Sequence, residues 1–156
     1  MSTARTLRLA QDERADALLA RDPFALVVGM LLDQQIPMEW AFTGPATIAA
    51  RMGIQDLDPA AVARFDPAEF VALMTGPPAV HRYPRSMGAR VQKLAAFVVD
   101  RYGGDVSRVW TEAGSGEELR RRDHKARLPH LCICRQSDVS LARLRQLRQH
   151  QLLVGV

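Results

Sequence analysis

The stretch "DPFALVVGMLLDQQIP", residues 22–37, decides the fold class. Apolar side chains recur along it at helical spacing, namely Phe24, Val27, Val28, Leu31 and Leu32. A helix that is apolar around most of its circumference lies in the centre of a core. The adjacent valines would also suit a strand, but the length of the run and the Asp-Pro pair at its start favour a helix. We therefore predict a central core helix that Pro37 ends within a turn.

Asp-Pro pairs stand at 22–23, 58–59 and 66–67, each directly before an apolar-periodic stretch. An N-cap aspartate accepts a hydrogen bond from a free amide of the first turn. Proline at the first helical position loses no hydrogen bond, because an amide there would have no partner within the helix. Glu69 follows Asp66 by three residues, which is the spacing of a capping box. We expect short helices in "PAAVARF" (59–65) and "PAEFVALM" (67–74).

Further helices are predicted on both sides of these. "GPATIAARMG" is expected to begin at Pro45 and to end at Gly53, and "SMGARVQKLAAFVVDRY" to begin at Ser86 and to end at the glycines 103–104. "DVSRVW" (105–110) and "SGEELRRR" (115–122) suggest two short helices more. The apolar face of the long helix contains Val91, Leu94, Ala95 and Val98. No strand alternation competes, so we predict an all-α single domain.

The composition is that of a packed globule. The chain has 156 residues, of which 47% are hydrophobic, enough for one domain with a core. No apolar run approaches the ~20 residues that span a bilayer, and "MSTARTLRLAQDERADALLARD" lacks the apolar region of a secretory signal. Two cysteines imply no disulfide framework. We expect a cytoplasmic protein without a membrane partner, and no cofactor is indicated.

Positive charge is concentrated at the C-terminal end. Residues 1–118 contain 12 Arg and Lys against 15 Asp and Glu, a net charge of −3, whereas residues 119–156 contain 9 against 2, a net charge of +7. A basic segment attracts polyanions, because neutralising phosphates releases condensed counterions. A solvated arginine-rich tail is the alternative. If the segment binds nucleic acid, Arg120, Arg121 and Arg122 are the first candidates.

Several segments together resemble a known family. "DPFALVVGMLLDQQIP" and "RYPRSMGARVQKLAAFVVDRYGG" are similar in order and spacing to segments of the helix-hairpin-helix/Gly-Pro-Asp (HhH-GPD) superfamily of base-excision DNA glycosylases. "GMLLDQQIPMEWAF" and "HRYPRSMGARVQ" look closest to a small bacterial branch of it. The resemblance covers roughly residues 20–120. It implies an HhH-GPD-like helical core over residues 1–119 that binds duplex DNA, flips out a damaged base and cleaves the N-glycosidic bond. Bound to DNA, such a protein would be associated with the nucleoid.

The resemblance also implies roles for single residues. In the family, an amide-bearing residue after the buried helix fills the gap left by the extruded nucleotide, and Gln35 holds that place here, beside Gln34. A glutamine suits this task because its amide both donates and accepts hydrogen bonds. The alternative is a polar turn whose amides satisfy the last carbonyls of the helix. Trp40, Phe42 and Met38 could stack on an extruded base or pack under the loop.

The segment "HRYPRSMGAR" (81–90) is a second candidate for contact with DNA. Ser86 as an N-cap would leave free amides for a phosphate, and Arg85 and Arg90 would add positive charge. An ordinary capped helix with solvated arginines explains the same residues. His81 and Tyr83 are weaker candidates, and Asp33 is expected to be a surface acid.

The family's signature hairpin, "LPGxGxxxA", is not recognisable. Its place falls in "ARLPHLCICRQSDVS" (126–140), where Leu128-Pro129 fits but His130 stands where the first glycine is needed. The catalytic residue is therefore unassigned, with Asp138 as a weak candidate. An atypical, truncated or frameshifted C-terminal part that leaves the enzyme inactive would explain this departure from the family.

Two other interpretations of the C-terminal segment stay open. A non-catalytic module could bind DNA or a protein partner with residues 120–156 as a basic arm, helical over 138–153. A metal site could be built from His124, His130, Cys132 and Cys134, but the single residue between the cysteines is too short for the usual zinc spacing. We therefore expect no metal.

Overall fold

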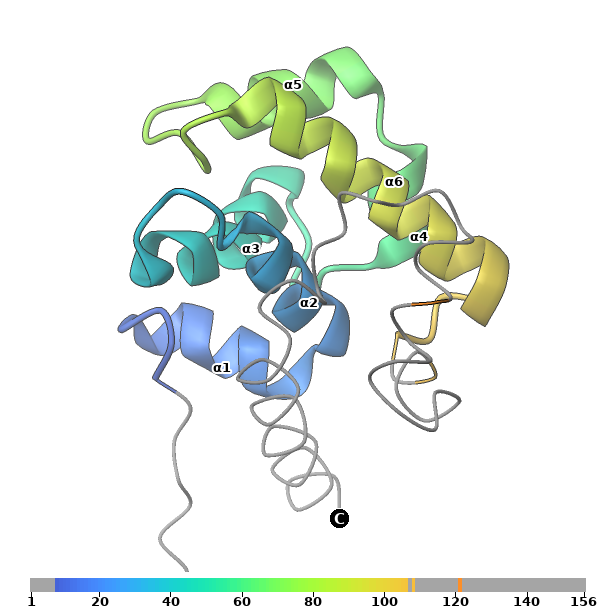
Figure 1. The fold of residues 1–156 in the computed structure, drawn as a ribbon, viewed down its shortest axis with the longest axis horizontal. Helices are drawn as coiled ribbons and strands as arrows, with labels where there is room; N and C mark the ends of the chain where they lie inside the picture. The colour runs from blue at the N-terminus through green and yellow to red at the C-terminus, as the bar shows by residue number, and fades with distance from the viewer. Residues whose placement is uncertain (1–7, 107, 109–120, 122–156) are drawn as a thin grey trace, which may run out of the picture.

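The computed structural model describes residues 8–106, 108 and 121, and this part of the chain is helical (Figure 1). Its helices are α1 (Glu13–Arg21), α2 (Pro23–Leu32), α3 (Met38–Met52), α4 (Pro59–Arg64), α5 (Pro67–Thr75) and α6 (Pro84–Tyr102). The described residues contain no strand. The prediction of an all-α fold is confirmed for them. Most of residues 105–122, and the basic segment 120–156 apart from Arg121, lie outside the described residues.

Helix α2 occupies the centre of the domain, as its sequence predicts. It packs against α1, α3 and α6, while α4 and α5 both pack on α6 (Figure 1). Eight of its ten residues are buried. The predicted apolar face of α6 is also buried, at Val91, Leu94, Ala95 and Val98. The core therefore lies between α2 and the three helices that surround it.

All three Asp-Pro pairs begin helices, so these predictions are confirmed. Asp58 accepts a hydrogen bond from the amide of Ala60 at 3.2 Å, and Asp66 accepts one from Glu69 at 3.0 Å. Asp22 does more than cap its own helix. One carboxylate oxygen accepts from the amides of Phe24 and Ala25, and the other accepts from Leu57 at 2.7 Å.

Asp22 is buried. Burial raises the pKa of its carboxyl group, the three backbone hydrogen bonds lower it, and the negative charge of Asp56 raises it, so that the pKa lies above its ordinary value. Through Asp22, the start of α2 is joined to the segment that leads into α4. The cap is thus a tertiary contact as well as a local one.

Two predicted helix starts are wrong. Helix α3 begins at Met38 rather than at Pro45, which lies buried inside it. Only one helical hydrogen bond is lost at Pro45, and burial of its ring offsets part of that loss. Helix α6 begins at Pro84, so Ser86 is in the first turn and is not the N-cap. Proline at the first position starts this helix because its φ is already helical.

The predicted helix ends at glycine are confirmed. Gly53 and Gly103 follow α3 and α6 in the left-handed conformation, with φ of 71° and 61°. The helix α1 was not predicted from the sequence. Asp12 caps it, and its buried Asp16 accepts hydrogen bonds from the amides of Leu9 and Ala10. This carboxylate ties the segment before α1 to the domain.

Helices α2 and α3 approach each other closely at two glycines. A Cβ atom on Gly29 would lie 2.6 Å from Cδ1 of Phe42, and one on Gly44 would lie 2.6 Å from Cδ1 of Leu32. Both distances are shorter than carbon atoms tolerate. Each helix therefore has a glycine where it receives a side chain of the other, and this contact fixes the position of the turn between them.

Candidate functional site

Two connecting segments meet on one side of the domain. The turn between α2 and α3 (33–37) and the loop between α5 and α6 (76–83) both lie at the left-hand side of Figure 1. We call this region, together with the first turn of α6, the two-loop surface. The candidate residues from the sequence between the end of α2 and the first turns of α6 lie in this region or next to it.

Gln34 is half-buried and completes the end of α2. Its side-chain nitrogen donates to the carbonyl of Leu31 at 2.9 Å, and its side-chain oxygen lies 3.4 Å from Nη1 of Arg90. The first contact satisfies one of the last carbonyls of the helix. For Gln34, the structure thus favours the interpretation as a polar helix end over direct contact with DNA.

Gln35 differs from its neighbour. Its side chain is exposed, and its φ is 61°, in the left-handed region that residues other than glycine seldom adopt. Such a conformation costs on the order of 1–2 kcal/mol and persists only where the surrounding structure holds it. Strained backbone of this kind clusters at functional sites, although Gln11, with a φ of 58° and an exposed side chain, shows the same combination before α1.

His81 holds this turn from the other loop. It is fully buried, and its Nε2 lies 3.0 Å from the main-chain oxygen of Gln34. Its Nδ1 accepts a hydrogen bond from the amide of Tyr83 at 2.9 Å. Because Nδ1 is an acceptor, the proton of the neutral ring is on Nε2, which donates to Gln34.

The surroundings of His81 disfavour its charged form. Burial lowers the pKa of the imidazole and the positive charge of Arg90 lowers it further, while hydrogen bonds to main-chain groups of Gln34 and Leu32 raise it in part. The neutral ring therefore joins residue 34 to residue 83 within the protein. This role was missed from the sequence, where His81 was only a weak candidate.

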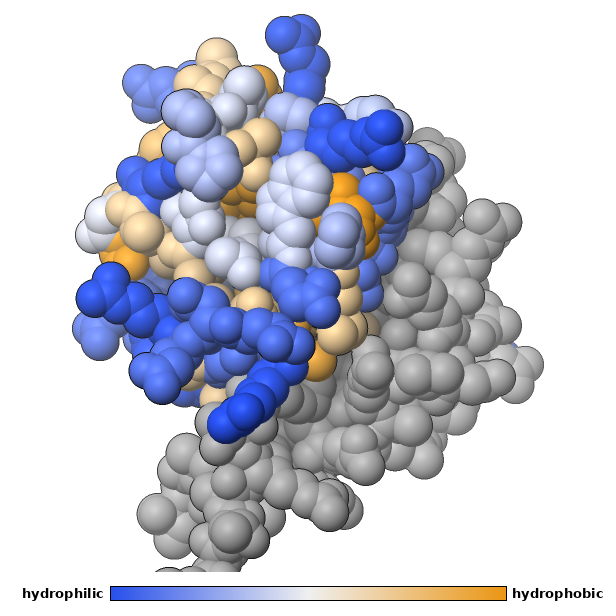
Figure 2. Space-filling model, turned by 90° about the vertical axis from the view of Figure 1, so that its left-hand side faces the viewer, coloured by the Kyte–Doolittle hydropathy of each residue, from blue (hydrophilic) through white to orange (hydrophobic). Residues whose placement is uncertain are grey.

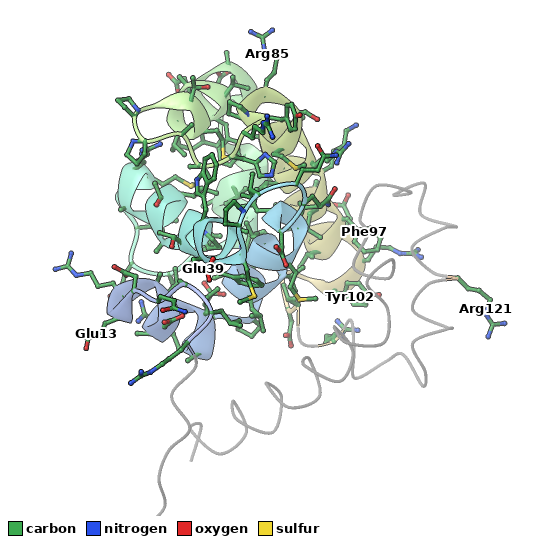
Figure 3. The ribbon with its side chains drawn as sticks, turned by 60° about the vertical axis from the view of Figure 1, so that its left-hand side comes forward. Glu13, Glu39, Arg85, Phe97, Tyr102 and Arg121 are labelled. Atoms are coloured by element: carbon green, nitrogen blue, oxygen red, sulfur yellow. The ribbon has the colours of Figure 1, made fainter. Side chains whose placement is uncertain are left out.

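The residues predicted around the start of α6 do not form one phosphate site. Arg85 is exposed and extends away from the body of the domain (Figure 3). Ser86 is exposed in the first turn, and the N-cap residue Tyr83 makes no side-chain capping bond. Arg90 is half-buried beside Gln34. Of the predicted DNA-binding residues in this segment, only Arg90 contacts the turn that contains Gln35.

Two large aromatic side chains are exposed near these loops. Trp40 is 39% exposed and Tyr83 is 47% exposed, whereas Phe42 is buried and Met38 packs against the core. The indole nitrogen of Trp40 donates to the carbonyl of Ala79 at 3.0 Å, which joins the start of α3 to the second loop. Figure 2 faces this side and shows a patch of intermediate and hydrophobic character surrounded by hydrophilic groups.

Arg51, at the other end of α3, also holds the second loop. Its guanidinium donates to the carbonyls of Leu73 and Pro78, each at 2.6 Å. The loop that contains His81 is therefore attached to α3 through two adjacent residues, Pro78 and Ala79. Asp33, expected at the surface, is half-buried at the C-cap of α2.

The remaining candidates from the sequence are mostly outside the described residues. Arg120, Arg122, Asp138 and the histidines and cysteines considered for a metal lie there. Arg121 is exposed, and in Figure 3 it lies at the right of the view, whereas Arg85 lies at the top. Over the described ranges, no three His, Cys, Asp or Glu side chains are grouped so that they could hold a metal ion.

No family model, no curated protein and no solved structure matches this chain. Within the part of the chain that the structure describes, no helix combines the length and the apolar character needed to cross a membrane.

Proposed function

We propose that the chain binds duplex DNA with the two-loop surface and inserts Gln35 where a damaged nucleotide has been extruded. The observation behind this proposal is the contrast between two neighbours: Gln34 is used inside the fold, while Gln35 is exposed on a left-handed backbone. The place of Gln35 in the sequence is also that of the gap-filling residue in the HhH-GPD family.

The chemistry of the surface suits this task. Extruding a base costs a few kcal/mol of stacking and pairing, and a side chain that replaces the base offsets part of the cost. The amide of Gln35 can donate to and accept from the partner base that remains. Trp40 and Tyr83 offer exposed rings for stacking, and Arg82 and Arg85 are exposed cations for phosphates.

Cleavage of the N-glycosidic bond is the further step that the resemblance implies. It needs a carboxylate that activates a water and stabilises the positive charge developing on the sugar. Asp138 is the weak candidate in the sequence and lies outside the described residues. We accordingly propose lesion recognition as the primary function and glycosylase activity as its second part.

Binding is tested with the full chain and two otherwise identical duplexes, one with a tetrahydrofuran abasic-site analogue and one intact. Fluorescence anisotropy should show tighter binding to the analogue, and Gln35→Gly should remove the preference. Equal affinity of the wild-type chain for both duplexes would reject the proposal. Release of uracil, alkylated or oxidised bases from duplexes tests the enzymatic part, and a chain that binds without releasing any of them is the non-catalytic module.

A further inference from the structure

The contacts of His81 extend the proposed function to a residue that does not touch DNA. We propose that neutral His81 is a positioning residue that sets the conformation of Gln35, and that protonation of its ring releases the turn. The part of this inference that concerns DNA rests on the proposed function. The part that concerns the turn stands on the protein alone.

The geometry around His81 gives the first support. The ring joins the carbonyl before Gln35 to the start of α6, through Nε2 to Gln34 and Nδ1 to Tyr83. The carbonyl of Gln34 belongs to the peptide group that leads into Gln35. Fixing this carbonyl limits the rotation of that peptide group, and with it the direction in which the Gln35 side chain leaves the backbone.

Hydrogen-bond complementarity gives the second support. In the neutral ring, one nitrogen donates and the other accepts, and the two main-chain partners match this pattern. In the protonated ring both nitrogens are donors, so Nδ1–H would face the amide N–H of Tyr83. The Tyr83 contact must then break, whereas Nε2–H can still donate to Gln34. The imidazolium would however be held in a buried site at a cost, so protonation favours movement of the ring out of this site, which frees the carbonyl of Gln34.

The charged groups near His81 bear on the same equilibrium. On α6, Arg90 lies close enough for its charge to oppose protonation, and the ring of Tyr83 lies 6.0 Å from the imidazole between ring centres. Asp33 is the acidic residue of the first connecting segment (33–37), and Arg82 is the arginine of the second (76–83). Asp33 is half-buried and precedes Gln34, and Arg82 is exposed and precedes Tyr83, so each is adjacent in sequence to a residue that His81 contacts.

The first measurement needs no variant. In NMR spectra of the full chain at pH 7.5, the ring nitrogens of His81 should show the Nε2–H tautomer. As the pH is lowered, the backbone amide of Gln35 should shift with the same midpoint as His81, below the usual value of about 6.5. The midpoints of the three other histidines of the chain distinguish this coupling from a general acid effect. A Gln35 amide that stays unchanged while His81 titrates would overturn the inference.

The second measurement links His81 to DNA. His81→Phe keeps a buried ring but removes both hydrogen bonds, and it should reduce the preference for the abasic-site duplex about tenfold, the size of one good hydrogen bond. The matched control is Gln92→Ala on α6, which removes side-chain bonds to the carbonyls of Val62 and Phe65 without touching the two loops. It should keep the preference.

The outcomes separate the two proposals. A wild-type chain with no preference between the duplexes rejects the proposed function, and the NMR titration still decides whether His81 holds the turn. A folded His81→Phe variant that keeps the full preference overturns the inference about His81 alone. If that variant does not fold, the NMR titration of the wild-type chain decides whether His81 holds the turn that contains Gln35.

Discussion

The Nε2 atom of His81 lies 3.0 Å from the main-chain oxygen of Gln34, although 47 residues separate the two along the chain. This contact joins the turn after the central helix to the loop before α6. Since Nδ1 of the same buried ring accepts from the amide of Tyr83, the two contacts of His81 are formed together only when the ring is neutral. Measurable consequences follow for stability as well as for binding.

We expect the free energy of unfolding to fall below about pH 6.5, in part through His81. Burial lowers the pKa of this imidazole in the folded chain, so between the folded and unfolded pKa values the unfolded chain binds the proton more readily. The contribution is complete above the unfolded pKa and is lost as the pH falls toward the folded one. Urea unfolding of the wild type and of His81→Phe at pH 7.5 and 5.0 measures this contribution. If the free energy of unfolding depends equally on pH in both proteins, the contribution of His81 is contradicted.

Gly29→Ala should destabilise the domain by about 1–3 kcal/mol, the usual cost of overpacking a core. The added methyl group would meet the buried ring of Phe42 at 2.6 Å. Adding Phe42→Leu should recover part of the loss, because the two substitutions share one contact. Gly76→Ala is the matched control, since its new Cβ would have only ordinary contacts from 3.5 Å. Comparable losses for Gly29→Ala and Gly76→Ala would argue against the close approach.

Asp22→Asn should lower the free energy of unfolding by about 1–3 kcal/mol, the cost of leaving a buried polar group unsatisfied. The amide can still accept from Phe24 and Ala25, but its NH2 group would then face the amide of Leu57. Asp58→Asn is the control, because that exposed aspartate makes a single capping bond that asparagine can replace. Thermal or urea unfolding should clearly separate the two variants.

Gln35→Gly should leave the domain as stable as the wild type or raise its stability by up to about 1 kcal/mol, because glycine adopts a positive φ without strain. Gln35→Ala has no such relief and serves as the comparison. Both variants should lose the preference for the abasic-site duplex. A destabilised Gln35→Gly would show that the side chain stabilises the fold itself.

Replacing Arg120, Arg121 and Arg122 together by glutamine should weaken DNA binding and reduce its salt dependence. For each phosphate that the variant no longer neutralises, the slope of log K against log salt should become shallower by about 0.9. The single replacement of exposed Arg64 on α4, far in sequence from this segment, is the control. An unchanged slope in the triple variant would remove these arginines from the DNA-binding surface.

Local signals in the sequence predicted most of the helix boundaries. The three Asp-Pro starts and the ends at Gly53 and Gly103 depend on interactions within a few residues, so the sequence contains them directly. The start of α3 was placed wrongly because proline usually begins a helix, whereas Pro45 is accommodated inside one. Short α1 was missed although its signals are local, because Asp12 caps it through Ala15 and Asp16 accepts from Leu9 and Ala10.

The candidate site was predicted only in part. Gln35 was chosen as a candidate by its position after the buried helix. That Gln34 caps this helix while Gln35 is exposed depends on the geometry of the turn. His81 could not be recognised, because its partner at Gln34 is distant along the chain and is a main-chain atom that any residue would provide. Tertiary contacts to backbone groups leave no pattern in a single sequence.

The two glycines at the contact between α2 and α3 have a consequence for motion. Phe42 lies over Gly29, and Leu32 lies over Gly44, so each helix inserts a side chain into a recess of the other. Sliding of one helix along its partner, the shear motion common among packed helices, would drive both side chains against backbone or Cβ atoms. This helix pair therefore has a single register, and any movement of Gln35 must come from rotations within residues 33–37.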